Sequence, residues 1–273
     1  MKKIFWVFFL LACFVGSIRQ AQAFGDKENF IEKKGTHFIV YYTKDVPEDF
    51  VNSIIDYAER YYDDLTDKLG FRRFDYWTWD NRAKIYIYPD QETFVAQTKQ
   101  PAWSGGAAIY ELKSIWTYPR AVGFFDSLLP HEIGHIVFRE VIGGKPVPLW
   151  LEEGVAQYLE QGKRFGAEKI VIKSIEEGTF IPFSRLMRIG PDELRQRTDV
   201  ELFYAESVHI VGYLIEKFGS RSFNEFCRKI RDGRSMDNAL SYAYFDIRNL
   251  SQLAELWEGN LRGKAKAKGK TFL

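Results

Sequence analysis

Two histidines in the apolar segment LLPHEIGHIVF, residues 128–138, have the spacing that points most directly to a chemistry. The chain has 273 residues and only four histidines, and His131 and His135 are four positions apart. Residues four apart lie on one face of a helix, so the two imidazoles could bind one metal ion. Glu132 completes an H-E-x-x-H pattern, in which the histidines bind zinc and the glutamate is the general base. The alternative is a pair of hydrogen-bonded histidines in a buried helix.

A third ligand should follow, because a catalytic zinc site has three protein ligands and an open fourth position. The segment PLWLEEGVAQYLEQG, residues 148–162, has apolar residues at helical spacing. It predicts a helix antiparallel to the first, with Glu152 and Glu153 near its start. We favour Glu153 as the ligand; the alternative is that both glutamates only stabilise the helix N-terminus. Two imidazoles and one carboxylate suit zinc without forbidding other divalent ions.

These two stretches together resemble a known family. HEIGH, then seventeen residues, then Glu153 within WLEEGVAQY resembles the gluzincin metallopeptidases, in particular the peptidase MA-like family related to the M1 aminopeptidases. The segment FYAESVHIVGYLIEKFG, residues 203–219, resembles the family segment in which a tyrosine precedes a helix ending in Tyr-Leu and then Gly. The resemblance covers residues 35–261.

The resemblance implies both a fold and a set of roles. The fold is α+β and thermolysin-like, with a mixed α/β N-terminal lobe followed by an α-helical lobe. It implies that His131, His135 and Glu153 bind one Zn²⁺ ion and that Glu132 is the general base. The activity it implies is hydrolysis of a peptide or protein substrate through a zinc-activated water.

Two further residues have candidate roles beside the metal. Tyr204 aligns with the tyrosine that stabilises the oxyanion in the M1-type pattern, although packing is an equal alternative in a chain with fifteen tyrosines. Glu160 could orient a ligand histidine through its ring N–H, or it could be an exposed helix glutamate. His209 is expected to be a hydrogen-bonded or surface histidine.

One departure from the M1 enzymes bears on specificity. The segment GGAAIYE, residues 105–111, matches the edge strand along which gluzincins bind an extended peptide. No GxMEN element follows it, so nothing recognises a free N-terminal amine, and an endopeptidase or narrow processing role is favoured over an aminopeptidase. Two alternatives remain open: a non-catalytic binding or assembly protein with the same fold, and a zinc hydrolase of a non-peptide amide such as a cell-wall cross-link.

The elements that must position these residues are a mixed α/β region and then a helical one. Hydrophobic periodicity predicts strands at 37–43 and 83–90, a strand pair at 105–119, and helices at 46–69 and 91–97. The pattern is mostly helical from residue 127 onward, with helices expected at 151–161, 207–218 and 223–231 and a pair within 236–261.

The termini are expected to lie outside the catalytic domain. Residues 1–23 have the pattern of a signal peptide, which predicts export to the periplasm or beyond and no stable membrane span after cleavage; lipoprotein anchoring through Cys13 is less favoured. One peptidase MA-like domain is expected at 24–261, with lobes near 24–142 and 143–261. Residues 262–273 are expected to be a basic flexible tail.

Composition narrows the class of partner. Cleavage would leave Cys227 as the sole cysteine, so no internal disulfide is expected, and its apolar helical position predicts a core thiol. The formal net charge of +1 becomes about −2 without Lys2, Lys3 and Arg19, which does not favour a nucleic-acid partner. The oligomeric state is left open.

Overall fold

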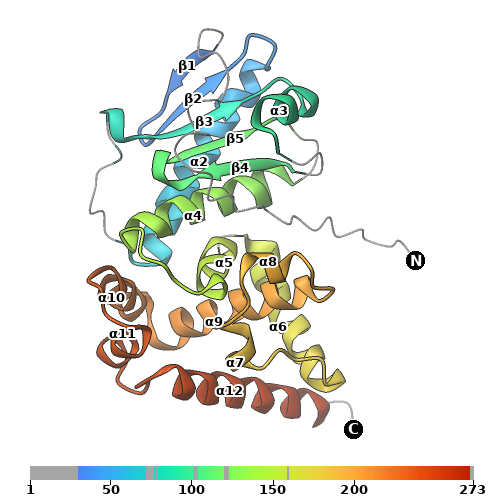
Figure 1. Ribbon diagram of the computed structural model, residues 1–273, viewed down its shortest axis with the longest axis vertical. Helices are drawn as coiled ribbons and strands as arrows, with labels where there is room; N and C mark the ends of the chain where they lie inside the picture. Colours follow the sequence, from blue (N-terminus) through green and yellow to red (C-terminus); the bar gives the residue numbers. More distant parts are fainter. Residues whose placement is uncertain are drawn as a thin grey trace. The chain divides into compact units, whose positions relative to one another are not determined.

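The computed structural model describes residues 30–71, 77, 79–100, 104–119, 123–158 and 160–270. Residues 1–23, expected to be a signal peptide, lie outside this range. The chain divides into two compact units, one of residues 1–59 and 77–128 and the other of residues 60–76 and 129–273. The division falls between Leu128 and Leu129, so the helix that bears HEIGH belongs to the second unit (Figure 1).

The first unit contains a five-stranded mixed sheet in the order β1-β2-β3-β5-β4. Its strands are β1 (Ile31–Lys34), β2 (Phe38–Tyr42), β3 (Ala83–Ile87), β4 (Gly106–Ile109) and β5 (Ser114–Thr117). The three central strands β2, β3 and β5 are parallel, and the outer strands β1 and β4 pair antiparallel with their neighbours. The connection from β2 to β3 contains α2 (Glu48–Lys68), and α3 (Gln91–Thr98) follows β3.

Strand alternation gives the central sheet two distinct faces. Val40, Ile85 and Ile115 are neighbours in the register and are fully buried on one face. The next positions form an aromatic row on the other face, where the ring of Tyr86 stacks between Tyr41 and Trp116 with centroids 4.9 and 5.3 Å away. Both patterns follow from the two-residue period of a strand.

The described residues of the second unit form helices and the loops between them, without a strand. The helix α4 (Leu129–Val141) is followed by α5 (Leu149–Tyr158), α6 (Gln161–Glu177) and α9 (Val200–Phe218), with the short α7 (Phe183–Leu186) and α8 (Pro191–Leu194) between the last two. The helices α10 (Ser220–Arg231), α11 (Met236–Ala243) and α12 (Leu250–Lys270) complete it. The helix α5 packs against α4 and α9, and α6 packs against α9 and α12.

The predicted α+β class, a mixed α/β part followed by a helical part, is confirmed. The predicted strand pair at 105–119 is present as β4 and β5, and β4 is an edge strand. Several helix bounds differ from those expected: α9 starts at Val200 rather than 207, α10 starts at Ser220 rather than 223, α5 ends at Tyr158 rather than 161, and α12 continues to Lys270. Alternating lysine and alanine, both good helix formers, allow α12 to extend into the segment expected to be a flexible tail.

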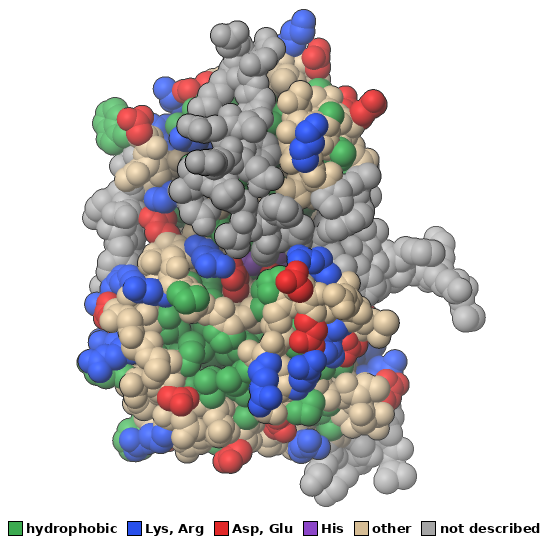
Figure 2. All heavy atoms as spheres, in the orientation of Figure 1, with side chains coloured by type: hydrophobic (Ala, Val, Ile, Leu, Met, Phe, Trp, Pro, Cys, Tyr) green, Lys and Arg blue, Asp and Glu red, His purple; other side chains and the backbone are tan. Residues whose placement is uncertain are grey.

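Charged side chains are mixed on the molecular surface. In the view of Figure 2, cationic and anionic side chains are interspersed across the described parts of the face shown. None of the helices in the described ranges is both long and apolar enough to cross a membrane.

Candidate metal centre

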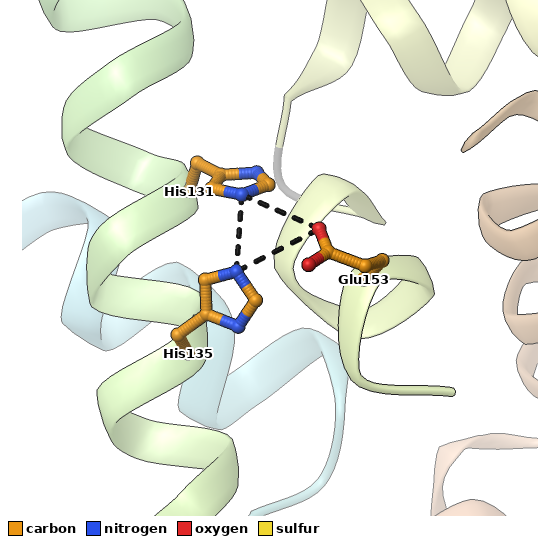
Figure 3. A group of neighbouring side chains, drawn as sticks. All are labelled: His131, His135 and Glu153. Carbon is orange, nitrogen blue, oxygen red and sulfur yellow. Dashed lines mark hydrogen bonds and ion pairs between the residues drawn. The ribbon is translucent and has the colours of Figure 1, made fainter. Parts of the chain in front are cut away.

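The three side chains predicted to bind one metal ion lie together in the second unit. His131 and His135 project from α4 toward Glu153 of α5 (Figure 3). Their Nε2 atoms are 3.0 Å apart, and Glu153 Oε2 is 3.6 Å from that of His131 and 3.8 Å from that of His135. A point equidistant from these three atoms lies about 2.0 Å from each, which matches zinc–nitrogen and zinc–oxygen bonds of about 2.0–2.2 Å. The donor set therefore fits a zinc ion without rearrangement.

Two glycines allow the helices to come close enough for this convergence. A Cβ atom on Gly134, between the two histidines, would lie 2.8 Å from the Cα of Ala156 on α5. A Cβ atom on Gly154, directly after Glu153, would lie 2.5 Å from the carbonyl oxygen of Ser207 on α9. Backbones can approach this closely only where the side chain is a hydrogen atom. The glycines of HEIGH and LEEG thus set the spacing of α4, α5 and α9.

The ligand set is buried, and burial keeps one of its imidazoles, that of His135, in the neutral form. The exposed fractions of His131, His135 and Glu153 are 6%, 0% and 2%. Burial, His131 and the Arg139 guanidinium hold the pKa of His135 well below its usual value. A neutral imidazole keeps the lone pair that a metal ion requires. The electrostatics therefore favour the metal-binding form of His135.

Glu160 contacts the first histidine on the side of the ring away from Glu153. Its Oε1 is 2.9 Å from His131 Nδ1, and its exposed fraction is 1%. Of the two roles considered for Glu160, the structure favours orientation of a histidine over an exposed helix position. The geometric reason differs from helical phase, because α5 ends at Tyr158 and Glu160 is the residue before α6. The position of Glu160 at the N-cap of α6 places its carboxylate beside His131.

Glu152 is turned toward a different partner. Arg139, one turn after His135 on α4, donates from Nε to Glu152 Oε1 at 2.7 Å and from a terminal nitrogen to Oε2 at 2.8 Å. The same Oε1 lies 3.7 Å from His135 Nδ1. Sequence reasoning missed Arg139; its position four residues after His135 on the same helix face was the available signal.

Glu132, the predicted general base, is buried beside the ligands. It has no exposed surface, and neither carboxylate oxygen has a hydrogen-bond partner among the described residues. Burial, with a smaller contribution from the charge of Glu160, raises the pKa of Glu132 to about 8. A buried carboxyl without hydrogen bonds is costly for stability, which is typical of a group kept for function.

The other residues singled out in the sequence are elsewhere in the second unit. Tyr204 is a half-buried residue of α9 whose ring contacts Phe203, and its role at an oxyanion stays a prediction. His209 accepts a hydrogen bond at Nδ1 from Trp257 Nε1 at 2.9 Å, as expected of a satisfied histidine. Cys227 is fully buried, and burial raises the pKa of its thiol, as expected of a core residue.

The chain is similar to a known protein family and to two solved structures. The family model of the Peptidase MA superfamily matches residues 78–262. Yeast LTA4 hydrolase in complex with bestatin is 16% identical with a TM-score of 0.44, over 91% of this chain and 39% of that chain. Native yeast LTA4 hydrolase is 16% identical with a TM-score of 0.42, over 76% of this chain and 34% of that chain.

This chain thus spans less than two fifths of the length of those hydrolases. No curated protein matches it in sequence. The family match extends over more than half of the chain and includes both HEIGH and the helix that bears Glu153. The chain therefore belongs to the peptidase MA superfamily, a group of metallopeptidases, as its motifs predict.

Proposed function

We propose that this chain is an exported zinc-dependent peptidase that cleaves within peptide or protein substrates. The observation that carries the proposal is the convergence of three buried ligand atoms about 2.0 Å from a common point, beside the isolated carboxyl of Glu132. Membership of the peptidase MA superfamily supports the same reaction class. Export rests on the signal-peptide pattern of residues 1–23 and can be tested by sequencing the N-terminus of the mature protein.

His131, His135 and Glu153 would hold the metal ion. Bound zinc supplies a Lewis acid that polarises a carbonyl and lowers the pKa of water toward about 7. Glu132 accepts the proton of the attacking water and then donates it to the leaving amine. Burial raises the pKa of Glu132 to about 8. A divalent cation bound nearby would lower this pKa and favour the ionised form, which accepts a proton. We assign Tyr204 as the hydrogen-bond donor to the oxyanion.

Of the two rival functions, Glu132 bears on the non-catalytic one. A binding or assembly protein with this fold would have no use for a buried base that lacks hydrogen bonds, so the isolation of Glu132 favours a hydrolase. The family supports peptide over other amide substrates. A zinc amide hydrolase acting on cell-wall cross-links would have the same metal chemistry and differ only in its substrate.

The decisive test is cleavage of peptide libraries by the zinc-loaded protein and by Glu132→Gln. We expect internal cleavage of peptides with blocked amino termini and a loss of at least about 100-fold in kcat/KM for the variant, with bound zinc unchanged. Cleavage of cell-wall fragments alone would show that the substrate is a non-peptide amide and not a peptide. Activity equal in Glu132→Gln and the wild type would contradict hydrolysis at this centre.

A further inference from the structure

A partly buried ion pair lies beside the second histidine of the proposed metal centre. Arg139 binds both oxygens of Glu152 in a bidentate arrangement, at 2.7 and 2.8 Å. The side chain of Glu152 is 5% exposed and that of Arg139 is 27% exposed. Bidentate guanidinium–carboxylate pairs fix orientation as well as distance, because two parallel hydrogen bonds hold the two planes together. The pair therefore ties α4 to the first turn of α5 in a defined geometry.

The pair faces the ring nitrogen of His135 that points away from the predicted metal site. Glu152 Oε1 is 3.7 Å from His135 Nδ1, while Nε2 of the same ring is 3.8 Å from Glu153 Oε2. A carboxylate oxygen beside Nδ1 favours the tautomer with the ring proton on Nδ1, which leaves the lone pair on Nε2. His131 also has a carboxylate at its Nδ1, that of Glu160, which lies within hydrogen-bond distance at 2.9 Å, whereas the contact of Glu152 with His135 is a longer, electrostatic one. Each histidine thus has one carboxylate on its outer side.

Arg139 also separates the roles of two adjacent glutamates. Glu152 and Glu153 are neighbours in the first turns of α5, and both carboxylates approach His135. Because the guanidinium donates to both oxygens of Glu152, it compensates the charge of that carboxylate and keeps its Oε1 3.7 Å from His135 Nδ1. Only Glu153 then presents a carboxylate to both Nε2 atoms.

We propose that Arg139 and Glu152 are positioning residues for the metal centre. Arg139 fixes the Glu152 carboxylate, Glu152 sets the tautomer and direction of His135, and Glu153 is left as the sole carboxylate ligand. This inference rests on the proposed function, since it assumes that zinc binds at His131, His135 and Glu153. Loss of such outer partners costs about 10–100-fold in metal affinity.

The test compares zinc affinity in four folded proteins by competition with a chelator: wild type, Arg139→Met, Glu152→Gln and a control, Arg197→Met. Arg197 forms a comparable two-point pair with Asp199 in the same unit. We expect about 10–100-fold weaker zinc binding in Arg139→Met and Glu152→Gln and no change in Arg197→Met. The absorption spectrum of the cobalt-substituted protein should change in the first two variants only, because it reports ligand geometry rather than stability.

Folding of the variants is controlled by a second set. Arg139→Met leaves the buried Glu152 without its cation, so Arg139→Lys and the neutral double variant Arg139→Gln with Glu152→Gln are measured beside it. Each should also bind zinc more weakly than the wild type. Zinc affinity and a cobalt spectrum equal to those of the wild type in every folded variant would overturn the inference and leave the pair a purely structural tie. A wild-type protein that binds no zinc would instead overturn the proposed function.

Discussion

At the scale of single residues, the proposed metal centre is built from polar side chains that contact one another in a buried setting. Each histidine has a carboxylate on the side opposite its Nε2 atom: Glu160 for His131 and Glu152 for His135. Outer carboxylates of this kind orient the ring and increase its basicity toward a metal ion. With the proposed ligand Glu153 and the proposed base Glu132, four glutamates surround the two histidines. Arg139 forms an ion pair with one of them, Glu152.

The contact between Glu160 and His131 leads to a prediction on metal affinity. Glu160→Gln should weaken zinc binding by about 10–100-fold, because the amide is a poorer acceptor for the ring N–H than the carboxylate. Isothermal titration with zinc measures the effect, and Glu176→Gln, an exposed change on α6, is the control. Equal zinc affinity in Glu160→Gln and the control would show that Glu160 does not orient the histidine.

At the scale of helices, the close approach of α4, α5 and α9 decides where the ligands lie. Gly154→Ala should lower the free energy of unfolding by about 1–3 kcal/mol, because its Cβ would lie 2.5 Å from a backbone oxygen of α9. Gly212→Ala on α9 is the matched control, since the nearest atom to its Cβ is 3.7 Å away. Alanine should stabilise that site by up to about 1 kcal/mol. Urea denaturation that ranks the two variants in the reverse order would contradict this packing.

A second helix-scale prediction concerns pH. Glu206 of α9 is buried and accepts a hydrogen bond from Ile181 N at 2.9 Å, and burial raises its pKa to about 9. The folded protein therefore retains a proton that the unfolded chain releases near its ordinary pKa of 4.5. Stability should fall as the pH rises from about 4.5 to about 9.

Glu206→Gln should flatten this pH dependence and raise the melting temperature at pH 8. Melting curves of the zinc-saturated protein between pH 5 and pH 9 measure it, so that the metal site does not contribute a titration of its own. A wild type and variant with parallel curves over this range would show that Glu206 is ionised in the folded protein.

Most of the helices and strands could be predicted from the sequence. The strands β2, β3, β4 and β5 and the helices α2, α4 and α5 were predictable because apolar residues recur in them at strand or helix spacing. The strand β1 and the helices α6, α7 and α8 were not predicted. The polar β1, with the sequence IEKK, and the short α7 and α8 carry too little periodicity to be recognised.

The convergence of the three proposed ligands was predictable from the sequence, and the contacts around them were less so. HEIGH and LEEG specify the three converging atoms, because helix geometry fixes which side chains share a face. The contact of Glu160 depends on a bend after Tyr158, and that of Arg139 on the packing of α4 against α5. Both depend on tertiary structure, which local spacing does not determine.

At the scale of the whole molecule, all the proposed zinc ligands lie in the second unit. Metal removal should therefore destabilise that unit selectively, because it leaves buried carboxylates without their cation. Saturation at about 1,000 times the dissociation constant would add about 4 kcal/mol of stability. Calorimetry with and without a chelator should show a large downward shift of one transition. Identical thermograms would mean that no metal contributes to the fold.

The most direct measurement is the metal content of the purified protein, determined by mass spectrometry together with that of His131→Ala. The account predicts one zinc ion per wild-type chain and almost none in the variant, whose secondary structure should be intact by circular dichroism. A wild-type protein that takes up no divalent ion after incubation with zinc, or a variant that binds zinc as fully and as tightly, would contradict a centre formed by His131, His135 and Glu153.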